Sequence, residues 1–126
     1  MKNNTKCIIL RTPKTDRFKP LYNSLVSVSG IEIIVLESKM AKDFAELDKL
    51  GIKYNTENFH NIEQRDMRPS EIACAHTHNL AREIIGESAS GGIIFEDDAR
   101  ITDAIHLINT VSKFLEKHTS TSSILN

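Results

Sequence analysis

The sequence predicts an α/β fold, Rossmann-like, with a mainly parallel sheet and helices on both of its faces. The first observation behind this prediction is an alternation of short, β-branched apolar runs with longer segments of helical apolar spacing. The second is a length of 126 residues with no repeat, linker or low-complexity tract, which indicates a single domain around one core. We expect this domain to span residues 1–117, followed by a flexible tail at 118–126.

The first half of the chain contains two strand–helix pairs. Residues 7–10 form an apolar run that ends at Arg-Thr-Pro, which predicts a strand followed by a loop. Apolar residues at three- and four-residue spacing predict a helix over 16–28, with Pro20 near its first turn. A second β-branched strand is predicted at 31–36, and a second helix at 41–50 before a glycine.

The second half begins with a polar loop, predicted at 52–67. A helix follows at 69–86, because proline suits its first position and Glu71 favours the positive end of its dipole. A buried strand is predicted at 92–95, and a last helix at 104–117 with Thr102 or Asp103 as its cap. The buried stripe of the 69–86 helix is predicted to consist of Ile72, Ala75, His76, Leu80 and Ile84.

Composition excludes several classes of protein. A formal net charge of −1 gives no general attraction to nucleic acid or to anionic lipid, so no nucleic-acid partner is expected. No apolar run is long enough to span a membrane, and the N-terminal apolar run is too short for a signal peptide. We therefore expect a cytoplasmic protein in which Cys7 and Cys74 are reduced thiols.

The strand at 92–95 leads directly into three carboxylates, Glu96, Asp97 and Asp98. In open α/β folds, ligands bind at the carboxyl ends of the strands. Adjacent carboxylates repel one another, and a hard cation such as Mg²⁺ or Mn²⁺ would relieve that repulsion. The alternative is a solvated turn, in which aspartate forms local hydrogen bonds.

The start of the 69–86 helix carries a second set of polar residues. Cys74 and His78 are four residues apart and share a helix face, a spacing that also suits zinc, although no third and fourth ligand is evident. His76 lies on the predicted apolar stripe, which favours a hydrogen-bonded core histidine. His78 is the better functional candidate, and its alternative role is a structural hydrogen bond to the acidic turn.

A third set follows the first strand. Arg11, Thr12, Asp16 and Arg17 would place cationic and polar groups at the same sheet edge. Such groups suit a diphosphate or a nucleotide, and an ordinary solvated loop is the alternative.

Two of these segments carry a family resemblance. Residues 71–78, Glu-Ile-Ala-Cys-Ala-His-Thr-His, resemble the E-[IG]-G-C-x-x-S-H motif of glycosyltransferase family 25, with Ala73 at the usual glycine and Thr77 at the usual serine. Residues 92–98 resemble the strand that follows it and ends in [LF]-E-D-D, at a fitting separation. The first strand with Asp16 and Arg17 resembles the opening strand and nucleotide loop of the family, which includes bacterial lipopolysaccharide and lipooligosaccharide biosynthesis enzymes.

The resemblance implies the nucleotide-sugar-binding half of a GT-A-type fold. It implies transfer of a hexose, galactose or glucose, from a UDP-sugar to a lipooligosaccharide or lipopolysaccharide acceptor, at the inner face of the bacterial inner membrane. Asp98 and Glu96 would bind Mn²⁺ or Mg²⁺, and Asp97 would contact the ribose or the sugar. Nucleotide-sugar contacts would also come from Arg11, Thr12, Arg17 and His78, whereas Glu71, Cys74 and His76 belong to the motif as structural residues.

Only 28 residues follow Asp98, and they predict one helix and a tail, whereas family members continue into an acceptor half that supplies the catalytic base. No catalytic base is assigned. The alternative function is therefore a non-catalytic remnant that folds and self-associates. A sheet that stops at this strand exposes an edge, so we expect a homodimer or higher assembly. A receiver-like domain is a third hypothesis, which Arg11 disfavours because acids are needed at the end of the first strand.

Overall fold

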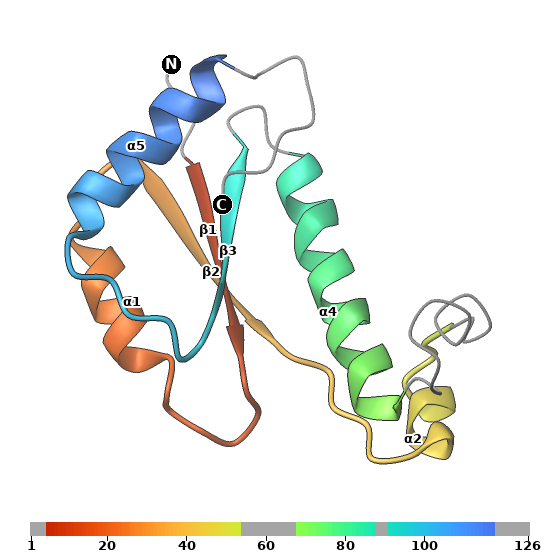
Figure 1. The fold of residues 1–126 in the computed structure, drawn as a ribbon. Coiled ribbons are helices and arrows are strands. Elements are labelled where there is room, and N and C mark those ends of the chain that lie inside the picture. Colours follow the sequence, from red (N-terminus) through yellow and green to blue (C-terminus); the bar gives the residue numbers. More distant parts are fainter. Residues whose placement is uncertain (1–4, 54–67, 88–90, 118–126) are drawn as a thin grey trace.

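A computed structural model describes residues 5–53, 68–87 and 91–117 of the chain (Figure 1). It shows an α/β fold with three parallel strands in the order β2-β1-β3. The strands are β1 (Thr5–Arg11), β2 (Ile31–Glu37) and β3 (Gly92–Glu96). The helices are α1 (Lys19–Val26), α2 (Phe44–Lys49), α4 (Pro69–Gly86) and α5 (Ala104–Lys117). The predicted parallel α/β architecture is therefore confirmed.

The register brings the carboxyl ends of the three strands together. Leu10 of β1 lies between Leu36 of β2 and Glu96 of β3. The segments that follow the strands consequently leave from one edge of the sheet, at the lower end of the strands in Figure 1. Crossover connections dictate this arrangement, because each returns the chain to the opposite edge before the next strand begins.

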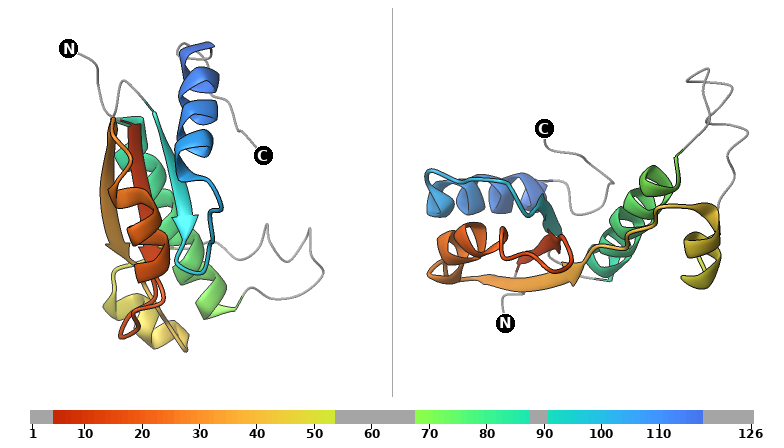
Figure 2. Two further views of the ribbon diagram at one scale, coloured as in Figure 1. Left: turned by 90° about the vertical axis from the view of Figure 1, so that its left-hand side faces the viewer. Right: turned by 90° about the horizontal axis from the view of Figure 1, so that it is seen from below.

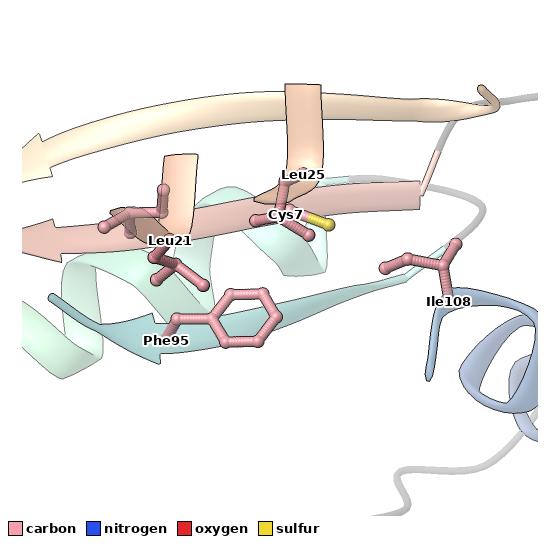
Figure 3. Packing of buried hydrophobic residues seen from close by; sticks show 6 residues of the cluster. Cys7, Leu21, Leu25, Phe95 and Ile108 are labelled. Carbon is pink, nitrogen blue, oxygen red and sulfur yellow. The ribbon is translucent and has the colours of Figure 1, made fainter. Parts of the chain in front are cut away.

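Helices cover both faces of the sheet (Figure 2). On one face, alternate residues of β1, Cys7 and Ile9, pack against α1 and α5, and Phe95 of β3 completes the cluster (Figure 3). On the other face, Ile8 and Leu10 pack against α4. Because β1 is buried on both sides, it is an uninterrupted apolar run, which is the usual pattern of a central parallel strand. Burial of each such side chain stabilises the fold by roughly 1.5–3 kcal/mol.

A smaller cluster joins α2 to the start of α4. Leu47 of α2 is fully buried, with Ala41 and Ile52 on either side of it in sequence, against Ile72 and Ala73 of α4. This cluster lies beyond the carboxyl edge of the sheet, as the lower right of Figure 1 shows. It supports the connection that follows β2.

Several predicted boundaries were wrong by a few residues. α1 begins at Lys19 and not at 16, because residues 16–18 form a turn in which the Lys19 N–H donates to the Asp16 carbonyl, and Pro20 occupies the first helical turn. α2 begins after Asp43, whose carboxylate accepts from the Glu46 N–H at 2.8 Å. Asp103 caps α5 as predicted, by accepting from the His106 N–H at 3.0 Å.

The buried stripe of α4 was partly wrong. Its buried residues are Ile72, Ala73, Thr77 and Ala81, and the predicted Ala75 is exposed. The stripe therefore differs from the expected line in all but Ile72. In β3 only Phe95 is buried, residues 92–94 are half-buried and Glu96 is exposed, because the strand lies at the edge of the described sheet. Nearly all of the predicted loop and tail, 54–67 and 118–126, lies outside the described residues.

Among the described helices, none combines the length and the apolar character that crossing a membrane requires.

Candidate functional site

A cleft opens at the carboxyl edge of the sheet. Its volume is about 250 Å³. The cleft is formed by the end of β1, the segments that follow the three strands, and the first half of α4. Its lining residues are Leu10, Thr12, Arg17, Ser38, Lys39, Met40, Ser70, Cys74, Thr77, His78, Glu96, Asp97 and Asp98.

The three consecutive carboxylates differ in exposure. Glu96 and Asp98 are exposed, and the Asp97 side chain between them is only 3% exposed. The Glu96 carboxylate lies 3.7 Å from the imidazole Nε2 of His78. This places the acidic strand end beside α4, but the distance is too long for the structural hydrogen bond considered for His78. Glu96 and Asp98 both line the cleft.

Asp97 joins the end of β3 to the loop after β1. One carboxylate oxygen accepts from the Thr12 backbone N–H at 2.8 Å, and the other accepts from the Arg17 guanidinium at 2.9 Å. We call this pair of hydrogen bonds the Asp97 bridge. Burial alone would raise the pKa of Asp97, but the hydrogen bonds from Arg17 and Thr12 outweigh burial and lower this pKa to about 2. Asp97 is therefore a buried carboxylate that stays ionised.

Thr77 joins α4 to the segment after β2. Its buried hydroxyl accepts from the Lys39 backbone N–H at 2.9 Å and donates to the Ala73 carbonyl at 3.1 Å. We call this pair of hydrogen bonds the Thr77 bridge. The Thr77 side chain thus provides an acceptor for the Lys39 backbone N–H, which has left the hydrogen bonding of the sheet. This bond holds the segment of Ser38, Lys39 and Met40 against α4.

Arg11 is the predicted site residue that the structure does not bring into the cleft. Its guanidinium donates to the Thr15 carbonyl at 3.2 Å, approaches the Asp16 carboxylate at 3.4 Å, and lies 4.7 Å from the centre of the Phe18 ring. These contacts stabilise the loop between β1 and α1 from outside the cleft. Thr12 and Arg17, by contrast, both line the cleft.

The residues predicted on α4 separate into two groups. Cys74 and His78 line the cleft on one helix face, as their spacing predicted. Glu71 accepts from the Arg68 backbone N–H at 3.1 Å at the start of the helix, and the half-buried His76 lies outside the cleft lining. Within the described ranges, no group of three or more His, Cys, Asp or Glu side chains is arranged to hold a metal ion by itself. A zinc site built on Cys74 and His78 therefore lacks further ligands in that part of the chain.

Sequence reasoning missed the wall of the cleft that follows β2. Ser38, Lys39 and Met40 line it, together with Leu10, Ser70 and Thr77. A signal for this wall was present, because any residue just after a parallel strand reaches the same sheet edge as Glu96. The strand predicted at 31–36 therefore carried the same signal as the strands that end near Arg11 and Glu96.

Comparison with known proteins identifies a family for this chain. The family model described as "Glycosyltransferase family 25 (LPS biosynthesis protein)" matches residues 11–125. No curated protein and no solved structure matches the chain. The match covers both resembling segments, the wall after β2 and the acidic strand end, so the chain belongs to glycosyltransferase family 25, a family of lipopolysaccharide biosynthesis proteins.

Proposed function

We propose that the cleft binds a UDP-hexose, galactose or glucose, together with Mn²⁺ or Mg²⁺, for transfer of the hexose to a lipooligosaccharide or lipopolysaccharide acceptor. The observation that carries this proposal is the pair of exposed carboxylates, Glu96 and Asp98, in a cleft that is also lined by Arg17. Membership of a lipopolysaccharide biosynthesis family supports the glycosyltransferase activity.

Glu96 and Asp98 suit a cation that arrives with a phosphate ligand. Mg²⁺ in nucleotide sites is commonly held by one or two carboxylates, substrate phosphates and water, so two protein ligands suffice. This accords with the lack of a three-ligand group among the described side chains. When bound, the cation would offset the negative charge that develops on the departing diphosphate.

The charge of the cleft explains why cation and diphosphate would bind together. Its lining contains three carboxylates and two cations, Arg17 and Lys39, and Asp97 already pairs with Arg17. Among the described lining residues, Lys39 only partly offsets the charges of Glu96 and Asp98, so we expect the cleft without a cation to repel a diphosphate. A divalent cation reverses the sign of the charge, so nucleotide affinity should depend strongly on the metal.

The remaining lining suits the other parts of the donor. Leu10 at the end of β1 and the exposed Met40 offer apolar surface for a flat nucleobase. Ser38 and Thr12 offer hydroxyl groups near the ribose and phosphates. The volume of about 250 Å³ is slightly below the usual range for ligand sites, roughly 300–1,000 Å³, so these residues enclose only part of a nucleotide sugar.

Calorimetric titration of UDP and UDP-hexoses, with and without Mn²⁺, tests the site. We expect binding that is at least about tenfold tighter with Mn²⁺ and is lost in Asp98→Ala, since that substitution removes a cation ligand. Glu83→Gln removes an exposed carboxylate of α4 outside the cleft and is the matched control. No UDP binding in either condition, or binding that Asp98→Ala leaves unchanged, would refute the metal-site role.

A transfer assay separates the two functions left open by the sequence. UDP-hexose hydrolysis or transfer by the purified chain supports the enzyme. Metal-dependent UDP binding without either reaction supports a non-catalytic nucleotide-sugar-binding protein.

We also propose that the chain is cytoplasmic and forms a homodimer or higher assembly through an open edge of its sheet. Among the described strands, β2 and β3 each pair only with β1, and Val35 on β2 is partly exposed. Backbone donors and acceptors on an unpaired edge favour addition of another strand. Light scattering at high micromolar concentration would contradict self-association if it gave the monomer mass. We further propose a peripheral association with the inner face of the inner membrane, which sedimentation with anionic lipid vesicles tests.

A further inference from the structure

The three adjacent carboxylates at the end of β3 have different surroundings. Both oxygens of Asp97 already accept hydrogen bonds, from the Thr12 N–H at 2.8 Å and from Arg17 at 2.9 Å. Glu96 and Asp98, on either side of it in sequence, are exposed. Each Asp97 oxygen keeps a second lone pair, but the side chain is only 3% exposed, so a cation would reach these oxygens less readily than those of the exposed Glu96 and Asp98.

The Asp97 bridge determines where the Arg17 guanidinium lies. Arg17 is half exposed, and two groups hold its guanidinium: the Asp97 carboxylate and the Thr12 hydroxyl, at 3.3 Å. The backbone N–H of the same Thr12 donates to the Asp97 carboxylate. The end of β3 therefore positions both polar residues that the β1–α1 loop contributes to the cleft.

We propose that Asp97 is a positioning residue: it holds Thr12 and Arg17 against the cleft for the donor phosphates and does not coordinate the cation, which falls to Glu96 and Asp98. This inference rests on the proposed function, because it assigns Arg17 a phosphate to contact. It departs from the expectation that Asp97 touches the ribose or the sugar. The division of roles follows from the burial and hydrogen bonding of the three carboxylates, not from their order in the chain.

Separate measurements of Mn²⁺ affinity and UDP affinity test the division of roles. Electron paramagnetic resonance would measure Mn²⁺ binding, and calorimetry would measure UDP binding at saturating Mn²⁺. In Asp97→Asn we expect Mn²⁺ affinity within about twofold of wild type and UDP affinity lowered roughly tenfold, because a charge-assisted contact that orders Arg17 is lost. In Asp98→Asn we expect Mn²⁺ affinity itself to fall. Loss of Mn²⁺ binding in Asp97→Asn to the extent seen in Asp98→Asn would overturn the proposal.

A double-mutant cycle tests whether Asp97 acts through Arg17. UDP binding should weaken by about the same factor in Asp97→Asn, in Arg17→Gln and in the double variant. Each of the three disrupts the same contact between Asp97 and Arg17. Arg17→Lys, which keeps the positive charge beside Asp97, should recover part of the affinity. Effects that multiply in the double variant would show that the two residues act independently and would overturn the proposal.

Amide hydrogen exchange without ligand separates a failure of this inference from a failure of the proposed function. In Asp97→Ala the Thr12 amide should exchange at least about tenfold faster, because it loses its acceptor. If the wild-type chain binds neither UDP nor Mn²⁺, the proposed function fails, and faster Thr12 exchange would still show that the bridge orders the loop. Unchanged Thr12 exchange would refute the bridge. If Asp97→Ala does not fold, the Thr12 amide is followed in Arg17→Gln, where a smaller increase is expected.

Discussion

The two side walls of the cleft, the segments after β1 and after β2, are held in place by different interactions. The loop after β1 is held by a buried, ionised carboxylate, Asp97, through an arginine and a backbone N–H. The segment after β2 is held by a neutral hydroxyl, Thr77, through a backbone N–H and a carbonyl. One wall therefore depends on charge and pH, and the other does not. The difference shows that two walls of one cleft can be held in place by an ion pair on one side and by neutral hydrogen bonds on the other.

The largest expected effect comes from moving β3, because Asp97 directly follows this strand. A Cβ at Gly92 would lie 2.5 Å from the Lys6 carbonyl oxygen and 2.9 Å from Ile85, so Gly92→Ala forces β3 away from β1 and α4. We expect the melting temperature to fall by roughly 4–12 °C, as a cost of about 1–3 kcal/mol implies for a domain of this size. Differential scanning calorimetry measures the shift.

Gly86→Ala is the control for this substitution, because nothing lies within 4 Å of an added Cβ there. Its melting temperature should stay within a few degrees of wild type. If Gly92→Ala were equally harmless, the close approach of β3 to β1 would be wrong, and with it the position of Asp97.

Removal of the Thr77 hydroxyl should weaken only the wall after β2. Thr77→Val keeps the shape but leaves the partly buried Lys39 N–H without its acceptor, at a cost of about 0.5–1.5 kcal/mol. The Lys39 amide should exchange faster with solvent, and the Thr12 amide should be unchanged. Thr77→Ser, which retains the hydroxyl, should preserve Lys39 protection. Equal acceleration at both amides would mean that the two bridges are not separate supports.

Acid should weaken the Asp97 wall and not the Thr77 wall. The pKa of Asp97 is about 2 in the folded chain, below its value of about 3.9 in an unfolded chain, so its stabilisation is complete above about pH 4. This contribution is lost as the pH falls from 4 toward 2. Melting temperatures between pH 2 and pH 5 should therefore fall less steeply for Asp97→Asn than for wild type.

Thr77→Val serves as the control for pH, and its melting curve should run parallel to that of wild type. A profile for Asp97→Asn as steep as the wild-type profile would contradict an ionised, hydrogen-bonded Asp97.

The smallest expected effect concerns the Lys39 side chain. Its backbone N–H belongs to the Thr77 bridge, but its ammonium is exposed at the cleft, so Lys39→Ala should leave stability unchanged. UDP affinity at saturating Mn²⁺ should fall about two- to fivefold, as expected for an exposed charge near a diphosphate. Lys42→Ala, an exposed lysine outside the cleft lining, is the control. A similar loss in Lys42→Ala would indicate a general charge effect.

The sequence predicted the architecture because its signals were local. The unbroken apolar run of β1 indicated a strand covered on both faces, and the acidic residues after β3 indicated a ligand edge. The site was only partly predictable, because its supports join residues distant in the chain: Thr12 with Asp97, and Lys39 with Thr77. No periodicity shows that the middle one of three carboxylates is buried, or that Arg11 points away from the cleft while Arg17 lines it.

The most direct test is a crystal structure of the chain with Mn²⁺ and UDP, with the metal located by its anomalous scattering. We predict a manganese peak between the carboxylates of Glu96 and Asp98 and the UDP diphosphate, with Asp97 still accepting from Thr12 and Arg17. A manganese ion bound to Asp97, or a nucleotide bound away from the carboxyl edge of the sheet, would contradict the assignment of roles in this cleft.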